Sequence, residues 1–228
     1  MISVDTVYQT VLALANKEQR GYITPQEFNI HAEHAQMAIF EQYFYDINQF
    51  KRIPGNDTKY ANMVSVIEDK LTAFKSTSVP TANGGILGSN VYRVIGVTSG
   101  EGANTKVVEE VTIDEYNKTQ HSPLTKATAS RPVYWRATDK IYFEPTTGPF
   151  HISYISRPSK PKWTYIVVNE KPLWNSGAID KNDFDLHPSE QNELVIKILQ
   201  LSGVTIKDFN LVQAAVQEEV KGINQEKQ

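Results

Sequence analysis

The sequence predicts an α+β protein with an N-terminal bundle of long helices, a small central antiparallel β unit and C-terminal helices. In the first third of the chain, apolar residues recur every three or four positions, which is typical of amphipathic helices. In the middle, short β-branched and aromatic runs alternate with Gly, Pro, Asn and Asp, as in strands joined by turns. The helical period returns from His187 onward.

The length of 228 residues fits one large domain or two small ones. We expect residues 1–78 to pack with residues 187–223, because both segments carry helical apolar stripes that need a partner. Residues 79–186 would then form a β-rich insertion, and the polar residues 224–228 would fray. The alternative is a single composite domain that contains all of these parts.

Two helices separated by a capping signal are expected at the N-terminus. The apolar period of residues 4–15 predicts a first helix that ends near Gly21. Thr24, Pro25 and Glu27 then supply an N-cap, a proline at the first helical position and a capping-box glutamate, so a second helix begins here. Its core side would carry Phe28, Ala32, Ala35, Ile39, Tyr43, Ile47 and Phe50.

This second helix should stop before Pro54-Gly55, which gives a rod of roughly 40 Å at a rise of about 1.5 Å per residue. Phe40, Phe44 and Tyr45 lie partly outside its core stripe. Aromatic surface would therefore wrap much of the helix and require more than one neighbour. These three residues are candidates for a contact with another chain.

A third helix is predicted after Asp57, which can cap it, and it should end at the breakers of residues 78–80. Its apolar positions are Tyr60, Val64, Ile67, Leu71 and Phe74.

Six strands are predicted in the central part of the chain. They are Val91–Thr98, Lys106–Thr112, Val133–Ala137, Lys140–Glu144, His151–Ser156 and Thr164–Val168. Residues 137–139 indicate a tight hairpin, and the polar residues 113–130 a connecting excursion with one helical turn.

After the irregular residues 169–186, His187-Pro188-Ser189-Glu190 is expected to open a helix that runs to Gly203. Its apolar positions are Leu194, Val195, Ile198, Leu199 and Leu201. The period continues at Leu211, Val212, Ala215, Val216 and Val220, a second candidate contact surface.

Composition excludes several classes of function. The formal net charge of −3 and the sequence pI near 6.0 argue against a dedicated nucleic-acid binder. The absence of cysteine excludes disulfides and thiolate chemistry and suits a reducing cytosol. No signal peptide and no run of about 20 apolar residues is present, so we expect a soluble protein without a membrane partner.

The sequence contains only weak indications of catalytic, phosphate-binding or metal-binding sites. The glycine-containing residues 83–89 and 100–106 lack the spacing of a phosphate loop. Glu27, His31 and His34 could reach one metal ion from neighbouring helical turns, but they lack the zincin spacing. No serine lies in a nucleophile elbow. We therefore expect a protein that is not an enzyme, with no catalytic residues, cofactor or metal.

A further acidic run resembles the start of a calcium loop and fails as one. The sixth position of the run from Asp180 is Asp185 where glycine is needed, and the twelfth is Gln191 where glutamate is needed. Carboxylates that precede a helix have a sufficient structural reason, because they offset the positive end of its dipole.

Charge is unevenly distributed along the chain. Between Asn117 and Trp163, eight basic residues face only Asp139 and Glu144, whereas residues 178–228 are acidic. This pattern fits either chance clustering or head-to-tail contact between copies of the chain. The basic residues are Lys118, Lys126, Arg131, Arg136, Lys140, Arg157, Lys160 and Lys162.

Arg157, Lys160, Lys162 and Trp163 lie in one proline-rich segment. Extended backbone there could present cations and an aromatic ring to DNA or to an acidic partner. This is the basis of an alternative function in which the chain contacts DNA.

Three segments together resemble virion structural proteins of short-tailed bacteriophages, including marine and crAss-like phages. They are NKEQRGYITPQEFN (residues 16–29), YISRPSKPKW (residues 154–163) and DFDLHP (residues 183–188). Proteins of that kind are similar to head-to-tail connectors, which form rings under the portal and extend the DNA channel. No functional residue can be carried over individually, because connectors are not defined by a residue-level site.

The resemblance implies a cyclic homo-oligomer, with twelve-fold symmetry, in the neck or tail of a virion and made in the host cytoplasm. Its partners would be the portal, other tail or ring proteins, and genome DNA that passes through the lumen without specific binding. The candidate contact residues of the second and last helices would then serve subunit or portal contacts. Another tail or collar component is the nearest alternative. A second alternative is a DNA-contacting packaging or ejection factor that uses the segment from Arg157 to Trp163.

Overall fold

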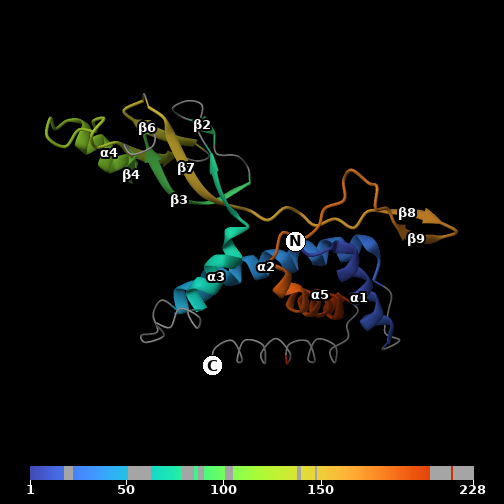
Figure 1. The fold of residues 1–228 in the computed structure, drawn as a ribbon. Helices are drawn as coiled ribbons and strands as arrows, with labels where there is room; N and C mark the ends of the chain where they lie inside the picture. The colour runs from blue at the N-terminus through green and yellow to red at the C-terminus, as the bar shows by residue number, and fades with distance from the viewer. Residues whose placement is uncertain are drawn as a thin grey trace. The chain divides into compact units, whose positions relative to one another are not determined.

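The computed structural model is a mixed α+β protein (Figure 1). It describes residues 1–17, 23–50, 63–78, 85–86, 90–100, 105–137, 140–146, 148–205 and 217. The chain divides into two compact units. The first unit combines Met1–Ala73 with Pro158–Gln228, and the second unit is Phe74–Arg157.

Helices form the core of the first unit. They are α1 (Val4–Lys17), α2 (Pro25–Phe50), α3 (Met63–Thr72), a 3-10 helix at Pro188–Glu190, and α5 (Gln191–Thr205). The long helix α2 contacts both α3 and α5, and α5 also contacts α1. The side chains buried between these helices include Val7, Val11, Phe28, Ile39, Leu194 and Ile198.

Helix α2 begins where its capping signal predicts. The Thr24 N–H donates to Glu27 Oε2 over 3.0 Å, and the Glu27 N–H donates to Thr24 Oγ1 over 3.3 Å. This reciprocal pair satisfies two amides that have no partner within the helix. The Thr24 backbone hydrogen bond also lowers the pKa of Glu27.

The aromatic residues of α2 divide between the core and the surface. Phe40 is fully buried, Phe44 is half-buried, and Tyr45 is 62 % exposed. The prediction that Phe40 contacts another chain is therefore wrong. The reason is that α3 and α5 both pack on α2, so its buried stripe is wider than a single amphipathic face.

Residues 158–187 belong to the first unit, although we predicted that the β-rich insertion extends from residue 79 to 186. Ile2 pairs with Phe184 and Lys162 with Asn182 in isolated antiparallel bridges. Between them, β8 (Tyr165–Val168) pairs with β9 (Lys171–Trp174) in a two-stranded hairpin. Strand β9 was not predicted, because residues 169–186 were expected to be irregular, and it contains Pro172, a residue that cannot donate a backbone hydrogen bond to a strand.

The second unit contains a seven-stranded sheet of order β1-β7-β3-β4-β5-β6-β2. The strands are β1 (Lys75–Ser78), β2 (Gly85–Ile86), β3 (Val91–Ser99), β4 (Lys106–Glu110), β5 (Val133–Ala137), β6 (Lys140–Glu144) and β7 (Phe150–Ser156). The predicted antiparallel unit needs correction, because β4 and β5 are parallel. Helix α4 (Ile113–Gln120) lies in the crossover between them, and a parallel pair needs such a long connection.

The sheet of the second unit curves into a half-barrel, and its inner face is buried. The core cluster is Val97, Val108, Tyr134, Ile141, Phe143, Phe150 and Ile152. Phe143 and Phe150 stack with ring centroids 4.2 Å apart. Because α4 has no buried residue, it does not cover this core, and curvature brings the apolar side chains of the strands together.

Several predicted features lie outside the described residues. They are the breaker Pro54-Gly55, the cap Asp57, the frayed tail 224–228 and the contact residues Leu211, Val212, Ala215, Val216 and Val220. Within the described ranges, none of the helices combines the length and apolar character that crossing a membrane requires.

Candidate functional site

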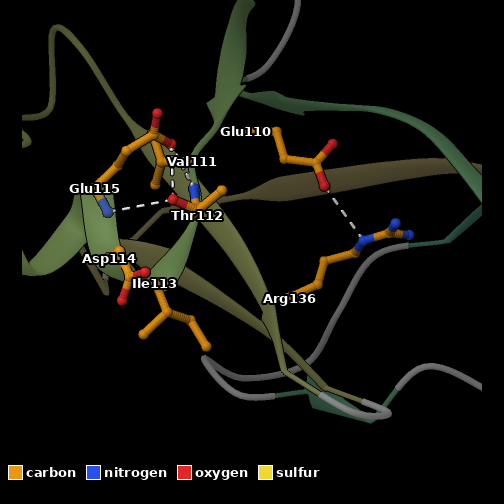
Figure 2. A pocket seen from close by; sticks show the side chains of 7 residues that line it. All are labelled: Glu110, Val111, Thr112, Ile113, Asp114, Glu115 and Arg136. Atoms are coloured by element: carbon orange, nitrogen blue, oxygen red, sulfur yellow. Dashed lines mark hydrogen bonds and ion pairs between the residues drawn. The ribbon is translucent and has the colours of Figure 1, made fainter.

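A shallow hollow of about 680 Å³ lies at the start of α4 in the second unit (Figure 2). Its lining residues are Glu110, Val111, Thr112, Ile113, Asp114, Glu115 and Arg136. Thr112 and Glu115 form a second capping box, in which the Thr112 N–H donates to Glu115 Oε2 over 2.9 Å. This bond lowers the pKa of Glu115. The acidic groups at the helix start therefore have a folding role.

Glu110 completes the polar side of the hollow. Its carboxylate lies 3.3 Å from Arg136 Nε and accepts a hydrogen bond of 2.9 Å from the Tyr134 hydroxyl. Burial, reinforced by this hydrogen bond, raises the pKa of Tyr134 to about 12. Tyr134 thus stays a neutral donor at physiological pH, and the three groups tie β4 to β5.

In the segment predicted to contact DNA, Lys160 and Lys162 form ion pairs within the first unit. Lys160 Nζ lies 2.8 Å from Glu33 Oε1, and Lys162 Nζ lies 2.6 Å from Asp180 Oδ2. The side-chain hydrogen bond from Lys162 lowers the pKa of Asp180. Arg157 is exposed at the end of the second unit.

The excess of basic residues along residues 117–163 overestimates the number of positive charges that are available for a partner. Among ion pairs between described residues, four involve basic residues counted between Asn117 and Trp163, and all four partners lie outside that window. The pairs are Arg131 with Glu109, Arg136 with Glu110, Lys160 with Glu33, and Lys162 with Asp180.

Trp163 is buried, which corrects its prediction as a DNA contact. Its indole N–H donates to Asp5 Oδ1 over 2.9 Å, and its backbone N–H donates to Asn29 Oδ1 over 2.8 Å. The Tyr8 ring packs against it at a centroid distance of 4.2 Å. Trp163 therefore fastens the chain to α1 and α2 immediately before β8 begins.

Gln36 provides a second attachment for the same segment. Its side chain is buried, and Nε2 donates to the Ser159 carbonyl over 2.7 Å while Oε1 accepts from the Asp185 N–H over 3.1 Å. Asp185 Oδ2 also accepts from the Ser159 N–H over 2.7 Å. The three segments that carry the phage resemblance thus meet in the first unit, at Asn29, Ser159–Trp163 and Asp185.

The acidic residues of the failed calcium loop have structural partners. Asp183 Oδ1 accepts from the Val4 N–H over 2.9 Å, at the start of α1. No group of three or more His, Asp or Glu side chains in the described ranges is arranged to hold a metal ion, and this includes the predicted candidates Glu27, His31 and His34.

The β8–β9 hairpin has two different faces. Tyr165 and Trp174 are cross-strand partners, and both rings stack on Trp163, at centroid distances of 5.8 and 5.7 Å. The opposite face, here called the hairpin face, consists of Ile166, Val168, Lys171 and Leu173. Its apolar members are between 43 and 50 % exposed.

A second exposed surface runs along α2. Its members, here called the α2 stripe, are Gln26, Ile30, His34, Ala38, Glu41, Tyr45 and Asn48. They recur every three or four residues, so they share one side of the helix. The stripe has one formal charge, at Glu41, and exposes 55 % of Ile30.

The contact residues predicted from the sequence include Tyr45, which is exposed in the α2 stripe, but none of the hairpin face. Residues 164–168 were assigned to a strand of the central β unit, and nothing marked their side chains as exposed. The signal that could have separated this hairpin is the pair Asn169-Glu170, which occupies the turn with positive φ at both residues.

No protein-family model matches the chain, and no curated protein matches it.

Proposed function

We propose that the chain is a structural protein that assembles with copies of itself into the connector ring of a tailed phage. The observation that carries this proposal is the hairpin face, an uncovered apolar surface on a firmly attached base. A two-stranded hairpin is marginal by itself in water, and contiguous exposed apolar side chains are typical of protein contact sites.

The contacts of Trp163 hold the base of the β8–β9 hairpin in one position on α1 and α2. Trp163 forms three hydrogen bonds to α1 and α2, stacks on Tyr165 and Trp174, and packs against Tyr8 in a tilted arrangement. Because these contacts order the root in advance, binding through the hairpin would lose little conformational entropy. A rigid, apolar, projecting element of this kind suits a permanent contact between subunits.

The position in a virion neck depends on the resemblance of residues 16–29, 154–163 and 183–188 to short-tailed phage proteins. In this proposal the ring lies under the portal, contacts other tail proteins, and lets genome DNA pass without specific binding. The net charge of −3 suits such a channel, because strongly basic walls would retain DNA.

The test is the mass of the purified chain, alone and after co-expression with the portal protein encoded in the same genome. We expect a closed oligomer of the chain by itself, or one that forms on the portal, and electron microscopy should show it as a ring. A chain that remains a monomer under both conditions would overturn the proposal.

A further inference from the structure

Two exposed surfaces of the first unit, the hairpin face and the α2 stripe, are complementary in charge, and the otherwise mostly polar α2 stripe exposes two large apolar side chains, Ile30 and Tyr45. Each carries a single formal charge, Lys171 on the hairpin face and Glu41 on the α2 stripe, and the signs are opposite. Neither residue forms an ion pair with another described residue of its own chain. The remaining members carry no formal charge, with His34 counted as neutral.

We propose that the hairpin face of one copy docks on the α2 stripe of the next copy, with Lys171 opposite Glu41. This inference rests on the proposed function and names the contact that joins the subunits. It involves two different surfaces, so every subunit offers one of each to its two neighbours. Such a contact repeats around an axis and closes into a ring when its rotation allows.

The spacing of side chains on the two surfaces is compatible. On the hairpin, Lys171 pairs with Val168, and the Ile166–Leu173 pair lies two residues further, roughly 7 Å away at the rise of a strand. On α2, Tyr45 lies four residues beyond Glu41, about 6 Å along the axis. With Lys171 at Glu41, the Ile166–Leu173 pair therefore reaches Tyr45.

A chain's own hairpin does not make this contact. Tyr45 is 62 % exposed and Ile166 is 50 % exposed, so neither surface is covered within the chain. Figure 1 shows the hairpin at the α1 end of the first unit, away from α3, whereas Glu41 and Tyr45 lie in the half of α2 that leads to α3.

Exchanging the charges of Lys171 and Glu41 tests whether these two residues meet at the contact. We expect K171E and E41K each to weaken association of the full chain about tenfold or more at low salt, because like charges would meet at the contact. The double variant K171E/E41K restores opposite charges and should return association to near the wild-type level. E68K and K126E change exposed residues outside both surfaces and should leave the dissociation constant unchanged.

Cysteine pairing provides a test that does not depend on affinity. The chain has no cysteine, so an introduced thiol has no competing partner. After mild oxidation, a mixture of E41C chains and K171C chains should give a covalent pair of chains on a non-reducing gel, more than either variant alone.

Three outcomes separate this inference from the proposed function. Rescue by the double variant, together with the mixed crosslink, supports the contact. A wild-type chain that assembles, with charge variants that assemble equally well and no mixed crosslink, overturns this contact and leaves the proposed function standing. A wild-type chain that stays monomeric alone and with the portal overturns both.

Discussion

Exposed apolar side chains are arranged differently in the two units of the chain. In the second unit such residues are scattered, and Val107, which is 82 % exposed, lies opposite Thr98 on the neighbouring strand. In the first unit, Leu14, Val66 and Ile179 are scattered in the same way, but Ile166 lies directly opposite Leu173 with Val168 beside them, so these three exposed side chains form one surface. Single exposed apolar residues are common in folded proteins, whereas a contiguous patch marks a contact site.

The units also differ in what their buried aromatic residues do. In the second unit, Phe143 and Phe150 fill the inside of a curved sheet. In the first unit, Trp163 joins a strand-forming segment to two helices and supports an exposed element. Loss of either kind of residue should reduce stability, but only Trp163 should matter for association.

The largest expected effect tests this difference. Trp163→Ala removes a buried ring and leaves Asp5 without its indole donor, so we expect a loss of about 3–5 kcal/mol in the free energy of unfolding, together with weaker association. Phe143→Ala should cost a similar amount while chains that remain folded associate as before. Chemical denaturation and sedimentation would measure both. Equal effects of the two variants on association would remove the distinction between the units.

The next effect concerns the attachment of residues 158–187. Gln36→Ala removes two hydrogen bonds from a buried site, to the Ser159 carbonyl and the Asp185 N–H, and should cost about 1–3 kcal/mol. Gln42→Ala is the matched control on the same helix, because the Gln42 side chain is half-buried and donates to Asp46. A Gln36 variant as stable as the Gln42 variant would contradict the role of Gln36.

A smaller effect is expected at the helix cap of the first unit. Thr24→Ala should destabilise the protein by about 1 kcal/mol. It should also raise the pKa of Glu27 toward its ordinary value of 4.5, because the side-chain hydrogen bond from Thr24 is lost. A pH titration followed by NMR would measure the pKa.

The sign of the pH dependence follows from the lowered pKa of Glu27. A depressed pKa means that the ionised carboxylate stabilises the folded state. This contribution is present above pH 4.5, the ordinary value, and is lost as the pH falls through the lowered value. In the Thr24→Ala protein this contribution should be smaller and its loss should be complete at a higher pH, and an unchanged profile would contradict the capping role of Glu27.

Local signals predicted much of the helical part of the first unit. The start of α2 could be predicted because Thr24, Pro25 and Glu27 act within four residues of one another. The burial of Phe40 could not be predicted from one helix, because it depends on α3 and α5 packing on two sides of α2.

The sheet and the hairpin were harder to predict. Strand positions could be recognised, but the parallel pairing of β4 and β5 depends on the path of a 22-residue connection. Trp163 was taken as exposed because prolines and lysines surround it, whereas its partner Asp5 is 158 positions away. Long-range contacts of this kind leave no local pattern in the sequence.

The most direct test of the central claim removes the apolar character of the hairpin face. Ile166→Ser combined with Leu173→Ser changes two half-exposed residues, so the free energy of unfolding of the monomer should change by about 0.5 kcal/mol or less per residue. The matched control Val107→Ser changes an exposed strand residue of the second unit. Sedimentation equilibrium, with the portal protein present if the wild-type chain assembles only on it, should show the wild-type and Val107→Ser chains as oligomers and the double-serine chain as a monomer. An oligomer of unchanged mass and affinity in the double-serine chain would contradict assembly through this hairpin.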